Sequence, residues 1–181
     1  MHGRKNIWRI KLLKRIAITG PESTGKTQLA QQLATHFNTN WVTEYAREYI
    51  DHLNRPYNQD DILSIAKTQY KQVEALASQC NELLICDTHL LVTKIWSDHK
   101  YKECDQWILD HIEKQKIDLY LLCDIDLQWE ADPQREHPHL RMHLFNLYKQ
   151  NLESYNFNYR IVSGQGSDRI NNAIAFVNAI R

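Results

Sequence analysis

The sequence has 181 residues, with 22 lysines and arginines balanced by 22 aspartates and glutamates. This length suits one domain with a sizeable core, and the zero net charge argues against a nucleic-acid-binding protein, which needs a basic excess to hold phosphate backbones. Hydrophobic residues make up 43% of the chain, which is typical of a globular domain and excludes general disorder.

The same sequence favours a cytoplasmic location without a membrane partner. No apolar run approaches the roughly 20 residues of a membrane-spanning helix. The first residues lack the apolar core and cleavage site of a secretory signal. The four cysteines form no C-x-x-C pair, and Cys86 and Cys123 lie in apolar runs, so we expect reduced thiols.

Short apolar runs alternate with longer amphipathic segments from Arg15 onward. The first run ends in a glycine-containing turn, and Leu29, Leu33 and Phe37 then recur at helical spacing. Five strands are predicted, at Arg15–Thr19, Asn40–Thr43, Leu83–Asp87, Asp118–Cys123 and Tyr159–Val162. Because helical patterns separate these strands, the sequence predicts an α/β fold with a five-stranded parallel sheet and helices on both faces.

The polar segment from Asp124 to Arg141 interrupts this alternation before a helix predicted from about His139 to Tyr155. The segment is too long for a tight link and holds two prolines, so we interpret it as a lid, with a plain solvated loop as the alternative. No linker divides the rest of the chain. The predicted organisation is an N-terminal extension over residues 1–14 and one domain over residues 15–181, with the lid at about 124–141.

The turn after the first strand, GPESTGKT, matches the phosphate-loop pattern G-x-x-x-x-G-K-[ST]. Its backbone N–H groups and the following helix dipole suit a phosphate group. Lys26 is expected to reach the β- and γ-phosphates of ATP, and the Thr27 hydroxyl to bind Mg²⁺. An ordinary strand–turn–helix corner is the alternative. The predicted ATP-binding residues are Gly20, Glu22, Ser23, Thr24, Gly25, Lys26, Thr27 and Gln28.

Acidic residues follow three of the predicted strands, where ligands bind in open α/β sheets. Asp87 follows four apolar residues, as in a Walker B strand, so it is a candidate Mg²⁺ ligand; a helix-capping aspartate is the alternative. Glu44, in EYAREY, is a candidate base for an acceptor hydroxyl, or else pairs with Arg47 on a solvated helix face. Asp124 and Asp126 follow the fourth strand.

The lid carries the candidate cations for the transferred phosphoryl group, Arg135 and Arg141. His137, His139 and His143 resemble a metal cluster, but no carboxylate–histidine framework accompanies them, so zinc is the weaker reading. After the fifth strand, Ser163–Ser167 either caps the last helix through Ser167 or Asp168, or forms a backbone wall for the adenine base. The sequence leaves these two readings open.

Four segments taken in order resemble the ribosylnicotinamide kinase domain of the NadR family: GPESTGKT, WVTEYAREY, CDTHLLVTKIW and DIDLQWEADPQREHP. The resemblance implies a P-loop kinase fold and ATP-dependent phosphorylation of the 5′-hydroxyl of nicotinamide riboside, giving nicotinamide mononucleotide. It supports Glu44 as the base and places Asp87 and Thr88 at a metal or ribose contact. Catalysis is then expected from Lys26, Glu44, Asp87 and Arg135, and substrate contacts from Glu44, Tyr45, Arg47, Asp87 and Thr88.

The chain also departs from fuller members of that family, which carry an adenylyltransferase domain before the kinase. About 14 residues precede the first predicted strand here, so neither a repressor role nor the second step of NAD synthesis is expected. Two alternatives to the nicotinamide riboside kinase remain: a nucleotide-dependent regulatory ATPase, and a kinase of another nucleoside or nucleotide.

Overall fold

The computed structural model describes residues 12–181, so most of the predicted N-terminal extension lies outside the described residues. Five parallel strands form one sheet in the order β2-β3-β1-β4-β5. The strands are β1 (Lys14–Thr19), β2 (Trp41–Val42), β3 (Leu83–Asp87), β4 (Leu119–Cys123) and β5 (Tyr159–Val162). The predicted α/β fold with a five-stranded parallel sheet is therefore confirmed, although β2 is only half as long as expected.

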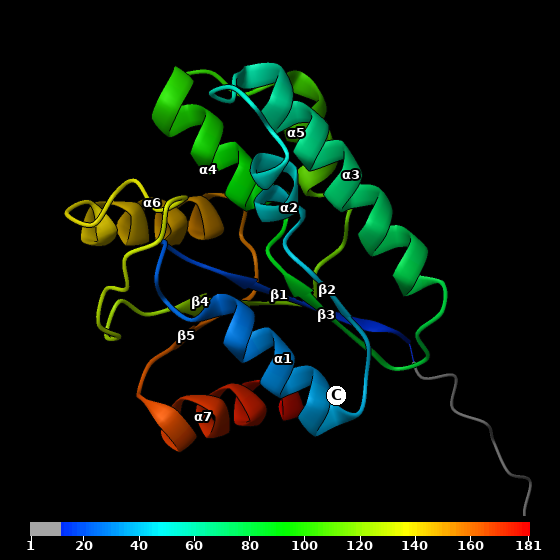
Figure 1. Ribbon diagram of the computed structural model, residues 1–181. Helices are drawn as coiled ribbons and strands as arrows, with labels where there is room; N and C mark the ends of the chain where they lie inside the picture. The colour runs from blue at the N-terminus through cyan, green and yellow to red at the C-terminus, as the bar shows by residue number, and fades with distance from the viewer. Residues whose placement is uncertain (1–11) are drawn as a thin grey trace, which may run out of the picture.

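Helices cover both faces of this sheet (Figure 1). They are α1 (Lys26–Phe37), α2 (Tyr45–Asp51), α3 (Gln59–Ala77), α4 (Leu90–Tyr101), α5 (Gln106–Ile112), α6 (Arg141–Ser154) and α7 (Gly166–Asn178). Helices α1 and α7 lie on one face, and α3, α4 and α6 lie on the other (Figure 1). The helix predicted from about His139 begins at Arg141 instead, two residues later, so the segment predicted as a lid ends at Leu140.

Alternate residues of the central strands build the two halves of the core. Ile16 and Ile18 pack towards α1 and α7, whereas Ala17, between them, packs towards α3, α4 and α6. All residues of β3 and β4 are buried, which explains their unbroken apolar sequences. A smaller apolar cluster joins α3, α4 and α5.

The strand register brings the predicted functional segments to one edge of the sheet. Ile18 of β1 pairs with Asp87 of β3, and Thr19 pairs with Leu122 of β4. The phosphate loop therefore begins beside Asp87 and beside the start of the 124–140 segment. This carboxyl edge is where ligands bind in open parallel sheets.

Asp61 fixes the start of α3, on the same side of the molecule as α2. Its carboxylate accepts hydrogen bonds from the Asn58 N–H at 2.7 Å, from Arg55 at 2.6 and 2.8 Å, and from the Tyr49 hydroxyl at 2.9 Å. The side chain of Asn58 in turn accepts from the Asp61 N–H, which completes a capping box. The Arg55 guanidinium and the Asn58 N–H hold the pKa of Asp61 well below its usual range.

We expect Asp61→Asn to lower the free energy of unfolding by about 1 kcal/mol near neutral pH, a value kept small because Arg55 is half exposed. A carboxyl group with a lowered pKa stabilises the fold above its unfolded pKa of about 3.9 and loses that effect as the pH falls. Urea unfolding at several pH values measures the difference. Asp60→Asn, an exposed neighbour in the same helical turn, is the control. A wild-type-to-variant difference that persists unchanged in acid would contradict this account.

Candidate active site

The phosphate loop joins β1 to α1 and depends on two glycines. Gly20 has a φ of +134°, and a Cβ atom there would lie 3.0 Å from the carbonyl oxygen of Cys123 in β4. Gly25 has a φ of +71° and serves as the N-cap of α1, with its carbonyl accepting the Leu29 N–H. The chain needs these residues to turn tightly between the sheet and the helix.

Within this loop, the backbone N–H groups of Glu22, Ser23, Thr24 and Gly25 have no hydrogen-bond acceptor among the described residues. Successive free N–H groups at the start of a helix form a concave site for an anion. The carbonyl of Pro21 instead accepts the Thr24 hydroxyl at 2.8 Å and the Lys26 ammonium at 2.9 Å. The loop therefore has the geometry and the charge to hold a phosphate group.

Asp87, at the end of β3, is fully buried, and neither carboxylate oxygen has a hydrogen-bond partner within residues 12–181. Burial and the nearby carboxylate of Glu44 raise the pKa of Asp87 to about 6, while the Thr27 hydroxyl and the Lys26 ammonium act in the opposite direction. An unpartnered buried carboxylate beside a hydroxyl is a donor set that fits Mg²⁺.

Elsewhere, too, the described residues contain no group of three histidine, cysteine, aspartate or glutamate side chains that could hold a metal. An Mg²⁺ ion at Asp87 and Thr27 would therefore need phosphate oxygens as further ligands. Of the histidines considered for zinc, His137 and His143 have rings 5.0 and 6.1 Å from that of His99, but these three do not form a group that could hold a metal, and His139 is exposed.

Glu44 is the N-cap of α2, and its side chain makes no capping hydrogen bond. Arg47, one turn later, forms an ion pair at 2.9 Å with Asp132 of the 124–140 segment, and this contact raises the pKa of Arg47. Arg47 thus forms its ion pair with the segment predicted as a lid and not with Glu44. The Glu44 carboxylate faces the cavity, near Asp87.

A cavity of about 1000 Å³ lies between the phosphate loop, α2, α4 and the 124–140 segment. Among the predicted site residues, the ones that line it are Gly20, Glu22, Ser23, Thr24, Gly25, Lys26, Thr27, Gln28, Glu44, Arg47 and Arg135. Three others do not line it. Asp87 is buried beneath the loop, Thr88 is buried with a φ of +76°, and Tyr45 packs its ring edge against Tyr49.

Tyr57 and Trp96 form an aromatic wall of the cavity, and we did not single out Trp96 from the sequence. The rings of Tyr57 and Trp96 lie 4.8 Å apart, and the Trp96 indole N–H donates to the Tyr57 hydroxyl at 3.0 Å. The Lys100 ammonium lies 3.4 Å from the centre of the Tyr57 ring. Trp96 could have been found from its spacing with Val92 and His99, which places all three on one helical face.

The 124–140 segment contacts the phosphate loop directly. Arg135 donates to the Ser23 hydroxyl at 3.3 Å, and the His137 N–H donates to the Glu22 carboxylate at 3.1 Å. Arg141 does not line the cavity; it donates to the carbonyls of Ser23 at 3.0 Å and Leu127 at 2.9 Å. Of the two predicted lid cations, therefore, Arg135 faces the cavity and Arg141 lies behind the loop.

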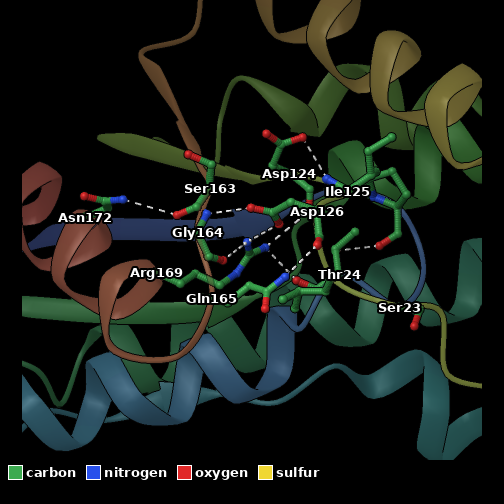
Figure 2. Close-up of polar contacts among 12 residues, drawn as sticks. Ser23, Thr24, Asp124, Ile125, Asp126, Ser163, Gly164, Gln165, Arg169 and Asn172 are labelled. Carbon is green, nitrogen blue, oxygen red and sulfur yellow. Dashed lines mark hydrogen bonds and ion pairs between the residues drawn. The ribbon is translucent and has the colours of Figure 1, made fainter.

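The acids after β4 contact protein groups (Figure 2). The Asp124 carboxylate accepts the Ile125 N–H at 2.8 Å, and Asp126 forms an ion pair with Arg169 at 2.7 Å. Of the two readings left open for Ser163–Ser167, the capping of the last helix by Ser167 or Asp168 is wrong. Helix α7 begins at Gly166 after Gln165, because Gly164 and Gly166 both adopt positive φ angles and complete the turn earlier.

Comparison with known proteins places this geometry in a family. A family model described as an AAA domain matches residues 15–169. The NadR protein of Salmonella typhimurium LT2, described as a trifunctional NAD biosynthesis/regulator protein, is 26% identical over 126 residues, which cover 66% of this chain and 30% of that protein. The chain thus matches under a third of the length of this relative.

Solved structures give the same picture of the fold. NadR with bound NAD and AMP-PNP has a TM-score of 0.77 at 20% identity, and NadR with bound NR has a TM-score of 0.74 at 21% identity. Each comparison covers 92% of this chain and 49% of NadR. A deoxyadenosine kinase of M. mycoides has a TM-score of 0.64 at 16% identity over its whole length. The resemblance to the NadR family and the P-loop kinase fold are confirmed. Across residues 12–181, no helix is long and apolar enough to span a membrane.

Proposed function

Because this chain belongs to the AAA domain family and has the fold of the P-loop kinases, we propose that it transfers the γ-phosphoryl group of ATP to a hydroxyl group of a small molecule. The observation that carries this proposal is that an anion-binding loop and the Glu44 carboxylate line one cavity, with the buried Asp87 carboxylate close to Glu44. An anion loop alone serves many nucleotide-binding proteins. The cavity beyond the carboxylates adds room for a second substrate.

The phosphate loop and the side chains around it would each have a role in this reaction. The N–H groups of residues 22–25 and the Lys26 ammonium would hold the phosphates, and Thr27 and Asp87 would hold Mg²⁺. When bound, Mg²⁺ neutralises phosphate charge. Glu44 would orient the acceptor hydroxyl and take its proton, and Arg135 would stabilise the transferred charge. Phosphoryl transfer depends mainly on positioning and electrostatics, and these side chains provide both.

The segment 124–140 would act as the lid of this site. Its ion pair from Asp132 to Arg47 and its bond from Arg135 to Ser23 connect the acceptor side of the cavity to the phosphate loop. A closed segment excludes water, which would otherwise accept the phosphoryl group in place of the second substrate. We propose residues 15–181 as one kinase domain, whose lid ends at Leu140, before α6 begins.

For the acceptor, we propose nicotinamide riboside, with nicotinamide mononucleotide as the product. Two observations support this choice: the similarity to NadR, whose solved structures include a complex with NR, and the aromatic wall of Tyr57 and Trp96 in the cavity. Aromatic rings bind flat rings by stacking, and their faces attract positive charge such as that of the nicotinamide ring. Because the Lys100 ammonium already lies over the Tyr57 ring, the nicotinamide ring would stack on Trp96. The fold shared with deoxyadenosine kinase makes other nucleosides the second candidates.

A panel of acceptors tests this function. We expect release of ADP from ATP and Mg²⁺ to be fastest with nicotinamide riboside, with kcat/KM at least about tenfold above that for adenosine, deoxyadenosine, cytidine or uridine, because ring recognition contributes about 1.4 kcal/mol or more. A reaction without acceptor is the control. Faster turnover of another nucleoside would overturn the acceptor but not the kinase, and equal ADP release with and without any acceptor would overturn both.

A further inference from the structure

We propose that Arg169 and Arg141 are positioning residues of the phosphate loop, which they hold from the side opposite to its anion site. Each donates to a backbone carbonyl of the loop, and the two carbonyls belong to successive peptide units. This inference rests on the proposed function in one respect, because it assumes that the loop binds the phosphates of a nucleotide.

Arg169, in the first turn of α7, joins three segments that are far apart in the sequence (Figure 2). One amino group of its guanidinium donates to the Thr24 carbonyl at 2.8 Å and to the Asp124 carbonyl at 3.3 Å. The other donates to the Asp126 carboxylate at 2.7 Å and to the Gly164 carbonyl at 3.2 Å. With only 7% of its side chain exposed, Arg169 is held in one place by these bonds.

Asp126 keeps that guanidinium in position. Its carboxylate also accepts the N–H of Gly164, and its backbone carbonyl accepts the side-chain amide of Gln165. These hydrogen bonds hold the turn between β5 and α7 against the segment that follows β4. Arg169 extends from this turn to the phosphate loop. The planar guanidinium can donate hydrogen bonds in two fixed directions at once. A lysine ammonium on a flexible chain does this less well.

Arg141 does the same for the preceding peptide unit from the first residue of α6. It donates to the Ser23 carbonyl at 3.0 Å with one amino group and to the Leu127 carbonyl at 2.9 Å with the other. Neither Arg141 nor Arg169 lines the cavity. The bonds that the structure gives them are to the loop, so we infer that they act on a bound phosphate through the loop.

The planarity of the peptide bond turns these contacts into control of the anion site. In a trans peptide the C=O and the following N–H point in opposite directions, and every peptide bond within residues 12–181 is trans. Holding the Ser23 carbonyl outward therefore points the Thr24 N–H inward, and holding the Thr24 carbonyl outward does the same for the Gly25 N–H. These are two of the loop N–H groups that have no acceptor among the described residues.

The test compares Arg169→Lys and Arg141→Lys with the matched control Arg15→Lys. Arg15 is also a part-buried arginine that bonds a carboxylate, Glu74, and a backbone carbonyl, that of Gln115, but it lies at the start of β1, away from the phosphate loop. Binding of ATP with Mg²⁺ and of inorganic tripolyphosphate is measured by calorimetry, together with thermal unfolding. Tripolyphosphate reports on the loop alone, because it lacks the base and the ribose.

We expect Arg169→Lys and Arg141→Lys each to weaken the binding of both ligands by about tenfold, the effect of misplacing one charge-assisted hydrogen bond. Arg15→Lys should lower the unfolding temperature as much as these variants do while leaving both affinities unchanged. Should Arg169→Lys not fold, Asp126→Asn provides the second variant, since it retains the guanidinium but weakens its anchor and is expected to reduce both affinities.

The possible results separate the inference from the function on which it rests. Wild-type protein that fails to bind ATP would overturn the proposed function itself. Wild-type protein that binds ATP, with lysine variants that bind it equally well, would overturn the inference alone. A loss of ATP affinity without a loss of tripolyphosphate affinity would also overturn it, because the effect would then lie at the base and not at the loop.

Discussion

Replacement of Lys26 by methionine is expected to lower kcat by about 10³-fold, the loss that follows when a cation at the transferred phosphate is removed from a preorganised site. The side chain lines the cavity, and its ammonium is held against the Pro21 carbonyl of the phosphate loop. Methionine keeps the apolar part of the side chain but cannot offset phosphate charge. Initial rates of ADP release at saturating ATP and acceptor measure the effect.

Lys149→Met is the matched control for this experiment. Lys149 is a lysine of α6 that lies 4.0 Å from Glu153 on an exposed face of the helix, so its loss should leave kcat unchanged. Thermal unfolding of both variants should match that of wild type within a few degrees, because neither side chain belongs to the core. A Lys26→Met enzyme with the wild-type rate would show that the loop does not hold the reacting phosphate.

The second large effect is expected at Asp87, where stability and activity should change in opposite directions. The raised pKa, about 6, means that folding disfavours the charged carboxylate, which burial and Glu44 both destabilise. As the pH rises from about 4 through 6, ionisation of such a carboxyl group lowers the free energy of unfolding. Near neutral pH this loss is on the order of 2 kcal/mol. Asp87→Asn removes this charge with little change in shape.

We therefore expect Asp87→Asn to unfold at a higher temperature than wild type in buffer containing a chelator, and to lose about 10³-fold in kcat with Mg²⁺ because a metal ligand is lost. Asp98→Asn, at a half-exposed ion pair on α4, should show neither change. An Asp87→Asn variant that is less stable than wild type without Mg²⁺ would contradict the account of the buried charge.

Glu44→Gln distinguishes the two carboxylates. If Glu44 takes the proton of the acceptor, this variant should lose kcat with nearly unchanged affinity for ATP, whereas Asp87→Asn should weaken the binding of ATP with Mg²⁺ as well. Equal losses of kcat and of ATP affinity in both variants would contradict the assignment of Glu44 as the base and Asp87 as the metal ligand.

The sheet and the phosphate loop could be predicted from the sequence because their signals are local. The apolar runs at β3 and β4 reflect burial on both faces, and the glycines of GPESTGKT reflect backbone conformations that other residues rarely adopt. Asp87 was found in the same way, since it directly follows a buried strand. The length of β2 was not predictable: Asn40 and Thr43 continue its pattern but lie outside the strand, although the Asn40 carbonyl still accepts the Ile85 N–H of β3 at 3.3 Å.

Contacts between distant segments could not be predicted from the sequence. Nothing in the sequence pairs Arg47 with Asp132 or Arg169 with Thr24, because such pairs depend on how the loops meet in space. The same reason explains Arg141, which was expected at the transferred phosphate but bonds the Ser23 carbonyl behind the loop. The capping of α7 was missed because two positive-φ glycines start the helix earlier than serine or aspartate would.

The most direct test of the central claim follows the phosphoryl group itself. ATP labelled at the γ-phosphate is incubated with Mg²⁺, nicotinamide riboside and the protein, and the label is separated by chromatography into nucleotide product and inorganic phosphate. Our account predicts that the label appears in nicotinamide mononucleotide, and that Lys26→Met slows this transfer by about 10³-fold. Label recovered only as inorganic phosphate, at a rate independent of nicotinamide riboside, would contradict it.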